Sequence, residues 1–397
     1  MTKKTRVNIA TAVAGFLGAG ICMLVLSGVG AVAGDRQSSM APIVVDRAES
    51  ATLPELMAKL SGERLVFVGE THTAYGDHLL QLDVLREMAA QPGKLAVGVE
   101  WIQARFQPVI DDYLAGRIDE SAFLRNTEYF DRWRFDYRLY RPIIEFARAG
   151  NIPIVALNAS RELTDAVKDV GIGGLTGELA EEAPDDYDFD NTDYENQLKQ
   201  MFAMHPAASE DEEGFDRFLQ VQLTWDEKMA ERVAEYLDAG DDHRMLVLAG
   251  KGHVSGRNGI PKRVTRRTGI RGVTIATFNP SARLFNTADY MILANDESLP
   301  PAGLMRVFLD ETEEGVFIRD FSPDSPAEKA GVKKNDRIAR IDGQPIRYFV
   351  DVKLQMLDKR PGDEIEVEMV RESLIMGDQS VVTRFKLGGE QSRHHAG

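Results

Sequence analysis

The stretch RLVFVGETH (residues 64–72) joins a short apolar run to a Gly-Glu-x-His motif. An apolar run of four residues between polar ones is typical of a strand that is buried on both faces of a parallel sheet. Gly69 predicts a sharp turn of the backbone that aims His72 into a crevice instead of into the sheet. His78 follows on a segment of helical periodicity, where it shares a face with Leu82. The order strand, turn, helix predicts an α/β unit.

Other parts of the chain repeat this arrangement. Amphipathic segments of helical periodicity, around residues 76–91, 106–116, 137–150 and 215–238, alternate with short apolar runs. The further strand candidates are LAVGVEW, IPIVALNA, RMLVLAGKGH and GVTIATF, at residues 95–101, 152–159, 244–253 and 272–278. The pattern predicts an α/β domain over residues 51–295, with a mostly parallel sheet flanked by helices.

The composition changes after Asn295. The segment DESLPPAGL supplies two prolines and a glycine, which predicts a linker over residues 296–302. Short strand patterns follow in RVFLD, GVFIRDF, DRIARIDG and EIEVEMV, and they predict a small, mainly β domain over residues 303–372. Residues 373–397 are interpreted as a C-terminal tail.

Charge and the N-terminus limit the function. The chain of 397 residues has 47 Lys and Arg against 63 Asp and Glu, a net charge of −16, which argues against nucleic-acid binding. Lys3, Lys4 and Arg6 precede an uncharged stretch that ends in AVAG, so residues 1–33 predict a signal peptide or an N-terminal membrane anchor. Residues 34–50 then form a linker. Lipid attachment at Cys22 is a third option, and all three place the folded part in the cell envelope, on the periplasmic side. The only cysteine, Cys22, cannot supply a thiolate cluster for a metal.

Polar side chains recur at the strand ends. Gly250-Lys251-Gly252-His253 repeats the spacing of the first motif, and Glu100 closes another strand. In open α/β sheets the crevice beyond the carboxyl ends of the strands is where ligands bind. The sequence therefore predicts that Glu70, His72, Glu100 and His253 gather at one edge of the sheet.

The helix predicted at residues 215–238 carries two polar residues on its apolar face. At about 100° per residue, Gln222 and Asp226 lie near the centre of that face. A buried carboxylate needs a partner, so these residues either brace a loop or line a polar pocket. His78, with Gln81 beside it, and the loop residue His205 are further candidates for a pocket.

Two segments keep two interpretations each. The aromatic segment YFDRWRFDYRLYRP (129–142) suits a platform for a planar ligand or a helix entry packed on the core. Residues 178–195 contain nine acidic residues and no basic one, which suits an exposed loop or a mobile lid.

The residues themselves suit a metal-dependent hydrolase. His72 and His253, with Glu70, would hold a divalent ion such as zinc or manganese. The catalytic candidates of this hypothesis are Glu70, Glu100 and Asp226, and Glu100 or Asp226 would act as the general base on a bound water.

Taken together, residues 60–278 resemble the ChaN family of haem-binding uptake lipoproteins, within the group that includes Tiki and TraB. The matching elements are GETH, the helix QVQLTWDEKMA, GKGH and several single residues. The resemblance implies haem as cofactor, iron uptake and membrane attachment, and a homodimer stays open. Some members of the wider group resemble metal-dependent peptidases that use the two G-x-x-H histidines. The cofactor-binding residues it implies are His72, His78, Gln81, His205, Gln222, Asp226 and His253.

Residues 303–372 resemble a PDZ domain of the bacterial protease-associated type, through GVFIRDFSPDSPAEKAGVKKNDRIARIDGQPI and RPGDEIEVEMVRE. The resemblance implies that an envelope protein or peptide adds a strand to the sheet, with its carboxylate held by backbone amides. Gly303, Leu304 and Met305 map onto the peptide-binding loop, and Arg306 stands where a glycine is usual. The alternative is a domain that only docks on its neighbour.

Overall fold

The structure is a computed structural model that describes residues 50–203, 212–278, 288–294, 297–372 and 377–389. The chain divides into two compact units. The first contains the described residues up to Asp119 and those from Asp131 to Glu297, and the second contains Glu120–Phe130 together with the described residues from Ser298 onward. Within the described ranges, no helix combines the length and the apolarity that crossing a membrane requires. The segment 1–33, with its predicted signal or anchor, lies outside the described residues.

The first unit is built on a parallel sheet, as the sequence predicted. Its strand order is β3-β2-β4-β1-β5-β6, and every neighbouring pair is parallel. The five strands expected from the apolar runs are all present. A sixth strand, β6, is only three residues long, which is too short for a sequence pattern to reveal. The strands are β1 Leu65–Glu70, β2 Lys94–Gln103, β3 Ile154–Asn158, β4 His243–Gly250, β5 Val273–Thr277 and β6 Tyr290–Ile292.

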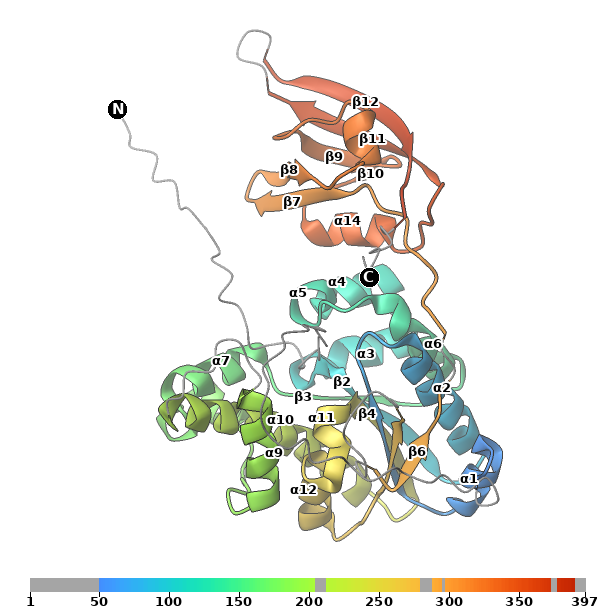
Figure 1. Cartoon of the computed structure of the whole chain (residues 1–397), viewed down its shortest axis with the longest axis vertical. Coiled ribbons are helices and arrows are strands. Elements are labelled where there is room, and N and C mark those ends of the chain that lie inside the picture. The colour runs from blue at the N-terminus through green and yellow to red at the C-terminus, as the bar shows by residue number, and fades with distance from the viewer. Residues whose placement is uncertain (1–49, 204–211, 279–287, 295–296, 373–376, 390–397) are drawn as a thin grey trace, which may run out of the picture. The chain divides into compact units, whose positions relative to one another are not determined.

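Helices flank this sheet (Figure 1), because alternate side chains of the strands are apolar on both faces. Helix α10 (Glu212–Asp238) and helix α12 (Ile260–Thr268) pack on one face, where Met229 and Val264 join the core cluster of Phe67 and Val247. Helix α2 (Tyr75–Ala89) contacts β1, β2 and β4. The other helices of this unit are α1 Leu53–Lys59, α3 Gln107–Leu114, α6 Arg141–Ala149, α7 Arg161–Val170, α8 Glu178–Glu182, α9 Thr192–Ala203 and α11 Lys251–Val254. Helix α4 (Glu120–Asn126) belongs to the second unit, and α5 (Tyr129–Arg132) spans the boundary between the units.

Two predicted segments differ in detail. The helix expected over residues 137–150 is a 3₁₀ turn, Tyr137–Leu139, followed by α6, which has a proline in its first turn. A proline lacks the N–H that a continuous helix would use, so it marks a helix start. The acidic segment 178–195 contains α8 and the start of α9. The remaining 3₁₀ turns are Ala104–Phe106, Ile172–Gly174 and Ser255–Arg257.

The second unit contains an antiparallel sheet of order β12-β11-β9-β8-β7, with β10 paired to β9. Ile338, Ile341, Val367 and Met369 lie in its core cluster. Strand β7 lies at one end of this order. The elements are β7 Val307–Thr312, β8 Gly315–Phe321, α13 Pro326–Lys329, β9 Arg337–Ile341, β10 Gln344–Pro345, α14 Phe349–Met356, β11 Glu364–Arg371 and β12 Gln379–Lys386.

Strand β12 lies in the segment that the sequence analysis interpreted as a tail, so that interpretation was wrong for residues 379–386. The strand pairs with β11 over its whole length, from Gln379 opposite Arg371 to Lys386 opposite Glu364. It is an outer strand that buries only Phe385. Its burial alternates, but Val382 on the exposed face and the polar Gln379 and Thr383 on the other interrupt the apolar alternation that reveals a half-buried strand.

Candidate functional site

The strand order explains why polar groups that are distant in sequence meet. Strand β4 lies between β2 and β1, and Gly250 at its end is in register with Glu70 at the end of β1. Because the three strands are parallel, their carboxyl ends lie at the same edge of the sheet. Glu100, His72 and His253 are carried by β2 and by the segments that follow β1 and β4.

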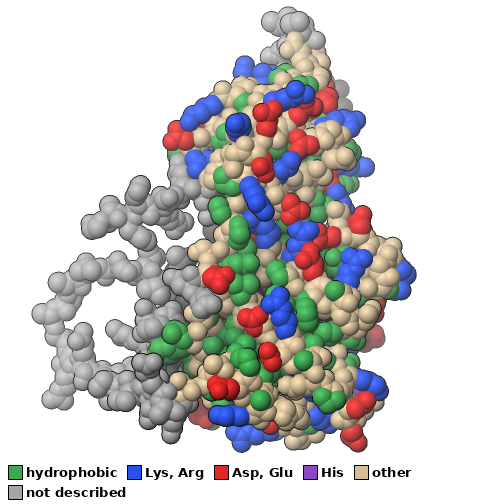
Figure 2. Space-filling model, turned by 90° about the vertical axis from the view of Figure 1, so that its right-hand side faces the viewer, with side chains coloured by type: hydrophobic (Ala, Val, Ile, Leu, Met, Phe, Trp, Pro, Cys, Tyr) green, Lys and Arg blue, Asp and Glu red, His purple; other side chains and the backbone are tan. Residues whose placement is uncertain are grey.

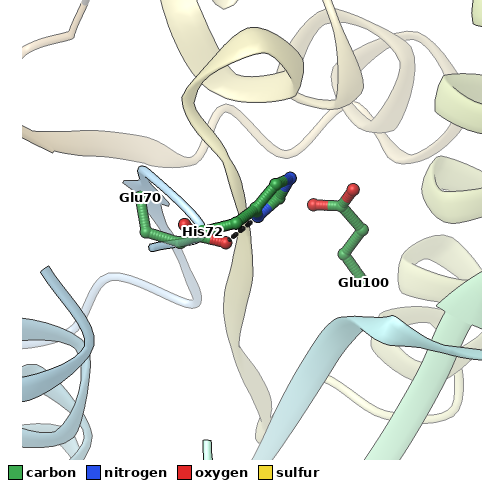
Figure 3. A group of neighbouring side chains, drawn as sticks. All are labelled: Glu70, His72 and Glu100. Atoms are coloured by element: carbon green, nitrogen blue, oxygen red, sulfur yellow. Dashed lines mark hydrogen bonds and ion pairs between the residues drawn. The ribbon is translucent and has the colours of Figure 1, made fainter. Parts of the chain in front are cut away.

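His72 lies between two carboxyl groups (Figure 3). Its Nδ1 donates to Glu70 Oε1 at 2.5 Å, and Glu100 lies on the other side of the ring. One ligand atom from each of the three residues lies within 4.8 Å of the others. All three side chains are buried. Imidazole and carboxylate groups so close together are the donors that a divalent ion takes.

His253 also lies between two carboxyl groups. Its Nδ1 donates to Asp226 Oδ1 at 2.6 Å, while its Nε2 lies 3.4 Å from Glu100 Oε1. Both imidazoles are thus held at Nδ1 by a carboxylate, and Glu100 lies between them. Histidines that bind metals commonly donate their second N–H to a carboxylate, which fixes the tautomer and the ring orientation. In this geometry Glu70 and Asp226 orient the rings.

Gly69 was predicted to let the backbone turn sharply, but neither Gly69 nor Gly250, the matching glycine of the second motif, has the left-handed φ that requires a glycine. The φ angle of Gly250 is −57°, an ordinary value, so no sharp turn requires a glycine. A Cβ at this position would instead lie 2.9 Å from His72 Cε1 and 3.5 Å from Glu100 Oε2. The N–H of Gly250 donates to Glu100 Oε2 at 2.6 Å. Glycine is needed because the backbone itself forms one wall of the centre.

The histidines and carboxylates of the centre shift one another's pKa values. Burial by itself would lower the pKa of His72 and of His253, but Glu70 in the first case and Asp226 with Glu100 in the second raise both pKa values above 6.5. Burial would raise the pKa of Glu100, yet the charge and hydrogen bond of His253 lower it to about 2. Without metal the imidazoles therefore keep their protons to higher pH than an ordinary histidine, and a metal ion must displace protons to bind.

We expect these charges to stabilise the metal-free fold most between pH 4.5 and pH 6.5, the ordinary pKa values of the two groups. The Glu100 contribution is present above pH 4.5 and is lost as the pH falls toward about 2. The histidine contribution is present below pH 6.5 and is lost as the pH rises through the raised pKa values. The measurement is the melting temperature with a chelator, for the wild type and for Glu100→Gln. A difference between them that does not shrink at alkaline pH would contradict the expectation.

Two other predicted pocket residues, His78 and Gln81, form hydrogen bonds away from the centre. His78 is buried, with Nδ1 near Gln81 Oε1 at 3.2 Å and Nε2 near the His72 carbonyl at 3.2 Å, so both ring nitrogens serve internal hydrogen bonds. Gln81 also donates to the Val68 carbonyl. In this structure the pair braces the loop that carries His72. Gln222 is buried on α10 as its periodicity predicted, and His205 lies outside the described residues.

Part of the aromatic segment covers the centre. The ring of Trp133 lies 4.9 Å from that of His72, and the ring of Phe135 lies 4.8 Å from it. Arg134 between them has a φ of 70°, which is rare for a residue with a side chain. The sequence analysis left the role of this segment open. In the structure Trp133, Tyr137 and Tyr140 are buried, as a helix entry packed on the core requires.

The centre fits an ion better than a porphyrin. His72, Glu100 and His253 are each no more than 9% exposed, and Gly250 leaves no room for a Cβ beside the His72 ring. A planar macrocycle does not fit between these side chains in this conformation. Glu70 Oε2 is buried and has no hydrogen-bond partner among the described residues, which a small cation would supply. The donor set thus suits a divalent ion.

Part of the predicted peptide-binding loop forms hydrogen bonds within the second unit. The N–H of Gly303 donates to the Lys359 carbonyl at 2.8 Å, and the N–H of Leu304 donates to the Gly388 carbonyl at 2.8 Å. Met305 is buried in the core. Arg306 has a φ of 57°, so the backbone keeps the conformation that a glycine favours. Its guanidinium donates twice to the Gly389 carbonyl, at 3.0 and 2.6 Å.

The surface gives no single-signed field on the face drawn in Figure 2, where acidic and basic side chains are interspersed. Exposed ion pairs among the described residues include Arg86 with Asp83 and Arg117 with Asp112. Exposed pairs contribute little to stability.

Comparisons with known proteins agree with both units. The family model described as "Haem-binding uptake, Tiki superfamily, ChaN" matches residues 56–264, more than half of the chain, and a PDZ domain model matches residues 303–377. The solved structure "Cofacial heme binding to ChaN of Campylobacter jejuni" is similar with a TM-score of 0.50 at 17% identity, over 61% of this chain and 91% of that one. At that identity the likeness shows the fold alone.

The PDZ part resembles segments of bacterial serine proteases. It is 33% identical over 67 residues to serine protease Do-like HtrB of Bacillus subtilis (strain 168), which is 16% of this chain and 14% of that protein. It is 27% identical over 70 residues to the periplasmic pH-dependent serine endoprotease DegQ of Escherichia coli (strain K12), which is 18% of this chain and 15% of that protein. The match spans about a seventh of these relatives, so their protease activity does not carry over.

Proposed function

Because this chain belongs to the haem-binding uptake family ChaN of the Tiki superfamily, we propose that it binds haem and takes part in haem or iron uptake at the cell envelope. The observation that carries the proposal is the family match over more than half of the chain. The solved ChaN structure of similar fold is described as binding haem cofacially, and we propose haem as the ligand here as well.

The haem would bind outside the buried centre. The centre is too closely packed for a porphyrin, so haem would bind at another surface of the first unit. His205 remains a candidate from the family resemblance. Iron in a haem protein is held by an axial side chain such as His or Tyr, and the pocket around it decides what the haem does.

Titrating hemin into the purified protein tests this proposal. We expect a saturable Soret shift, and we expect His72→Ala with His253→Ala to leave it unchanged, since the centre lies apart from the haem. A linear, non-saturable absorbance would overturn haem binding. A Soret shift that disappears in the double variant would instead place the haem at the centre after a rearrangement.

We further propose that the protein lies on the periplasmic side of the envelope, where the PDZ domain binds an extended peptide of an envelope protein. Strand β7 ends the sheet order, so it can accept an added strand. The amides of Gly303 and Leu304 are already used. We therefore expect the edge strand to contribute more affinity than a carboxylate contact.

The measurement is the affinity of the purified full chain for a peptide that has been selected for binding to it. Amidation of its C-terminus should change the affinity by less than about threefold, because a carboxylate held by several amides would contribute far more. A proline at an alternate backbone position should abolish binding, since it removes a ladder hydrogen bond. A tenfold or larger loss on amidation would contradict this use of the loop.

A metal-dependent hydrolase is the second candidate, favoured by the centre itself. His72, His253 and Glu100 would hold a divalent ion, which when bound lowers the pKa of a water and polarises a carbonyl. Glu70 would orient His72 through Oε1, and its Oε2, which has no hydrogen-bond partner among the described residues, would face the ion. Asp226, a predicted general base, is not available for that role, because both of its oxygens are engaged. We propose it as an orienting residue.

A further inference from the structure

We propose that Tyr194 is a positioning residue for this centre: its hydroxyl fixes the Asp226 carboxylate, and the fixed carboxylate orients His253 toward Glu100. This inference rests on the metal centre proposed above and adds to it a residue from a different part of the fold. Tyr194 lies on α9, in the acidic segment 178–195, remote in sequence from every residue of the centre.

The geometry leaves the carboxylate a single orientation. The hydroxyl of Tyr194 donates to Asp226 Oδ2 at 2.5 Å, while Asp226 Oδ1 accepts from His253 Nδ1 at 2.6 Å. Tyr194 is 2% exposed and Asp226 1% exposed, so water does not compete for either bond. A carboxylate with one donor on each oxygen cannot rotate without breaking a bond, and a buried unmade hydrogen bond costs about 1–3 kcal/mol.

Tyr194 is itself held on two sides. Its ring lies under the guanidinium of Arg263, 4.3 Å from ring centre to guanidinium carbon. Arg263 is fully buried and forms an ion pair with Glu227 at 3.1 Å. The backbone N–H of Tyr194 donates to Asn191 Oδ1 at 3.2 Å, just before α9 begins at Thr192. The ring therefore has little freedom, and its hydroxyl is aimed before any ligand binds.

The Tyr194 hydroxyl stays protonated, and therefore a donor, to higher pH than an ordinary tyrosine. Burial, and then the negative charge of Asp226, raise the pKa of Tyr194 well above its ordinary value. Since a phenolate would repel Asp226, the protonated form is the one that the geometry requires. The acidic segment thus does more than form an exposed loop, because its Tyr194 hydroxyl donates a hydrogen bond to Asp226, the carboxylate that holds His253.

Cobalt binding to the full chain tests the inference, because Co²⁺ reports its coordination in its visible spectrum. We expect Tyr194→Phe to weaken Co²⁺ about tenfold, the lower end of the range for outer partners of metal ligands, and to shift the d–d bands. The matched control is Tyr236→Phe, which removes a hydroxyl that donates to the Lys94 carbonyl in the same unit. We expect the control to leave both readouts at wild-type values.

A double-mutant cycle separates positioning from general stability. If Tyr194 acts through Asp226, Tyr194→Phe should have no further effect on Co²⁺ affinity in the Asp226→Asn background. Additive losses would overturn the inference, as would a Tyr194→Phe protein with unchanged affinity and spectrum. Should that variant fail to fold, Asn191→Ala loosens the start of α9, and the same band shift is expected. A wild-type protein that binds no Co²⁺, Zn²⁺ or Mn²⁺ would instead remove the metal centre itself.

Discussion

Replacing both His72 and His253 with alanine should abolish stoichiometric binding of a divalent ion. The two imidazoles lie close to Glu100, each held at Nδ1 by its own carboxylate. Without them only the carboxylates of Glu100 and Glu70 remain at the centre, and carboxylates without an imidazole hold such an ion weakly against water. We expect the affinity to fall by at least about a thousandfold, since even outer partners contribute ten- to a hundredfold.

Metal content after purification and titration with Zn²⁺ and Mn²⁺ are the measurements. His243→Gln is the matched control, because His243 begins β4 and contacts the Tyr236 carbonyl at 2.8 Å, outside the centre. The control should keep wild-type affinity. Equal metal content in the double variant and the wild type would show that the ion, if any, is bound elsewhere.

Replacing Glu227 with glutamine should destabilise the first unit more than any exposed substitution. Glu227 is fully buried and pairs with three arginines, at 3.1 Å to Arg263, 2.8 Å to Arg266 and 3.0 Å to Arg267. Arg263 is also fully buried, so the neutral variant leaves its charge unpaired in the interior. Removing one partner of a buried pair costs about 3–5 kcal/mol. For a unit of this size that lowers the melting temperature by about 10 °C.

Thermal and urea unfolding of the full chain measure this effect. Glu235→Gln on the same helix is the control, because the side chain of Glu235 is 53% exposed where it pairs with Arg232. It should change the free energy of unfolding by less than about 0.5 kcal/mol. A loss below 1 kcal/mol for Glu227→Gln would mean that the arginines find other partners or water.

The proposed metal centre and the proposed haem site lie in different parts of the first unit. The centre is closed, and Trp133 and Phe135 pack against His72, so a flat ligand cannot reach the imidazole as the chain stands. Haem binding is supported by the family, whereas the ion is supported by the local donors. The hemin and metal titrations, each performed on the His72 and His253 double variant, therefore separate the two.

Sequence by itself determined the strands and which polar residues lie at their ends. RLVFVGETH and RMLVLAGKGH are apolar runs that local pattern identifies, and the helical period places Asp226 on a buried face of α10. These features depend on neighbours one to four residues apart, which a linear chain displays directly.

Tertiary structure decided the pairings. Sequence could not show that Asp226 Oδ1 accepts a hydrogen bond from His253 instead of from a water, or that Asp226 Oδ2 accepts one from Tyr194. Those partners lie 27 and 32 positions away along the chain. It also hid β12, where Val382 on the exposed face and polar residues on the other interrupt the apolar alternation. Hydrogen bonds of a few ångströms depend on where the folded backbone carries each side chain, and the strand order β2-β4-β1 sets that position.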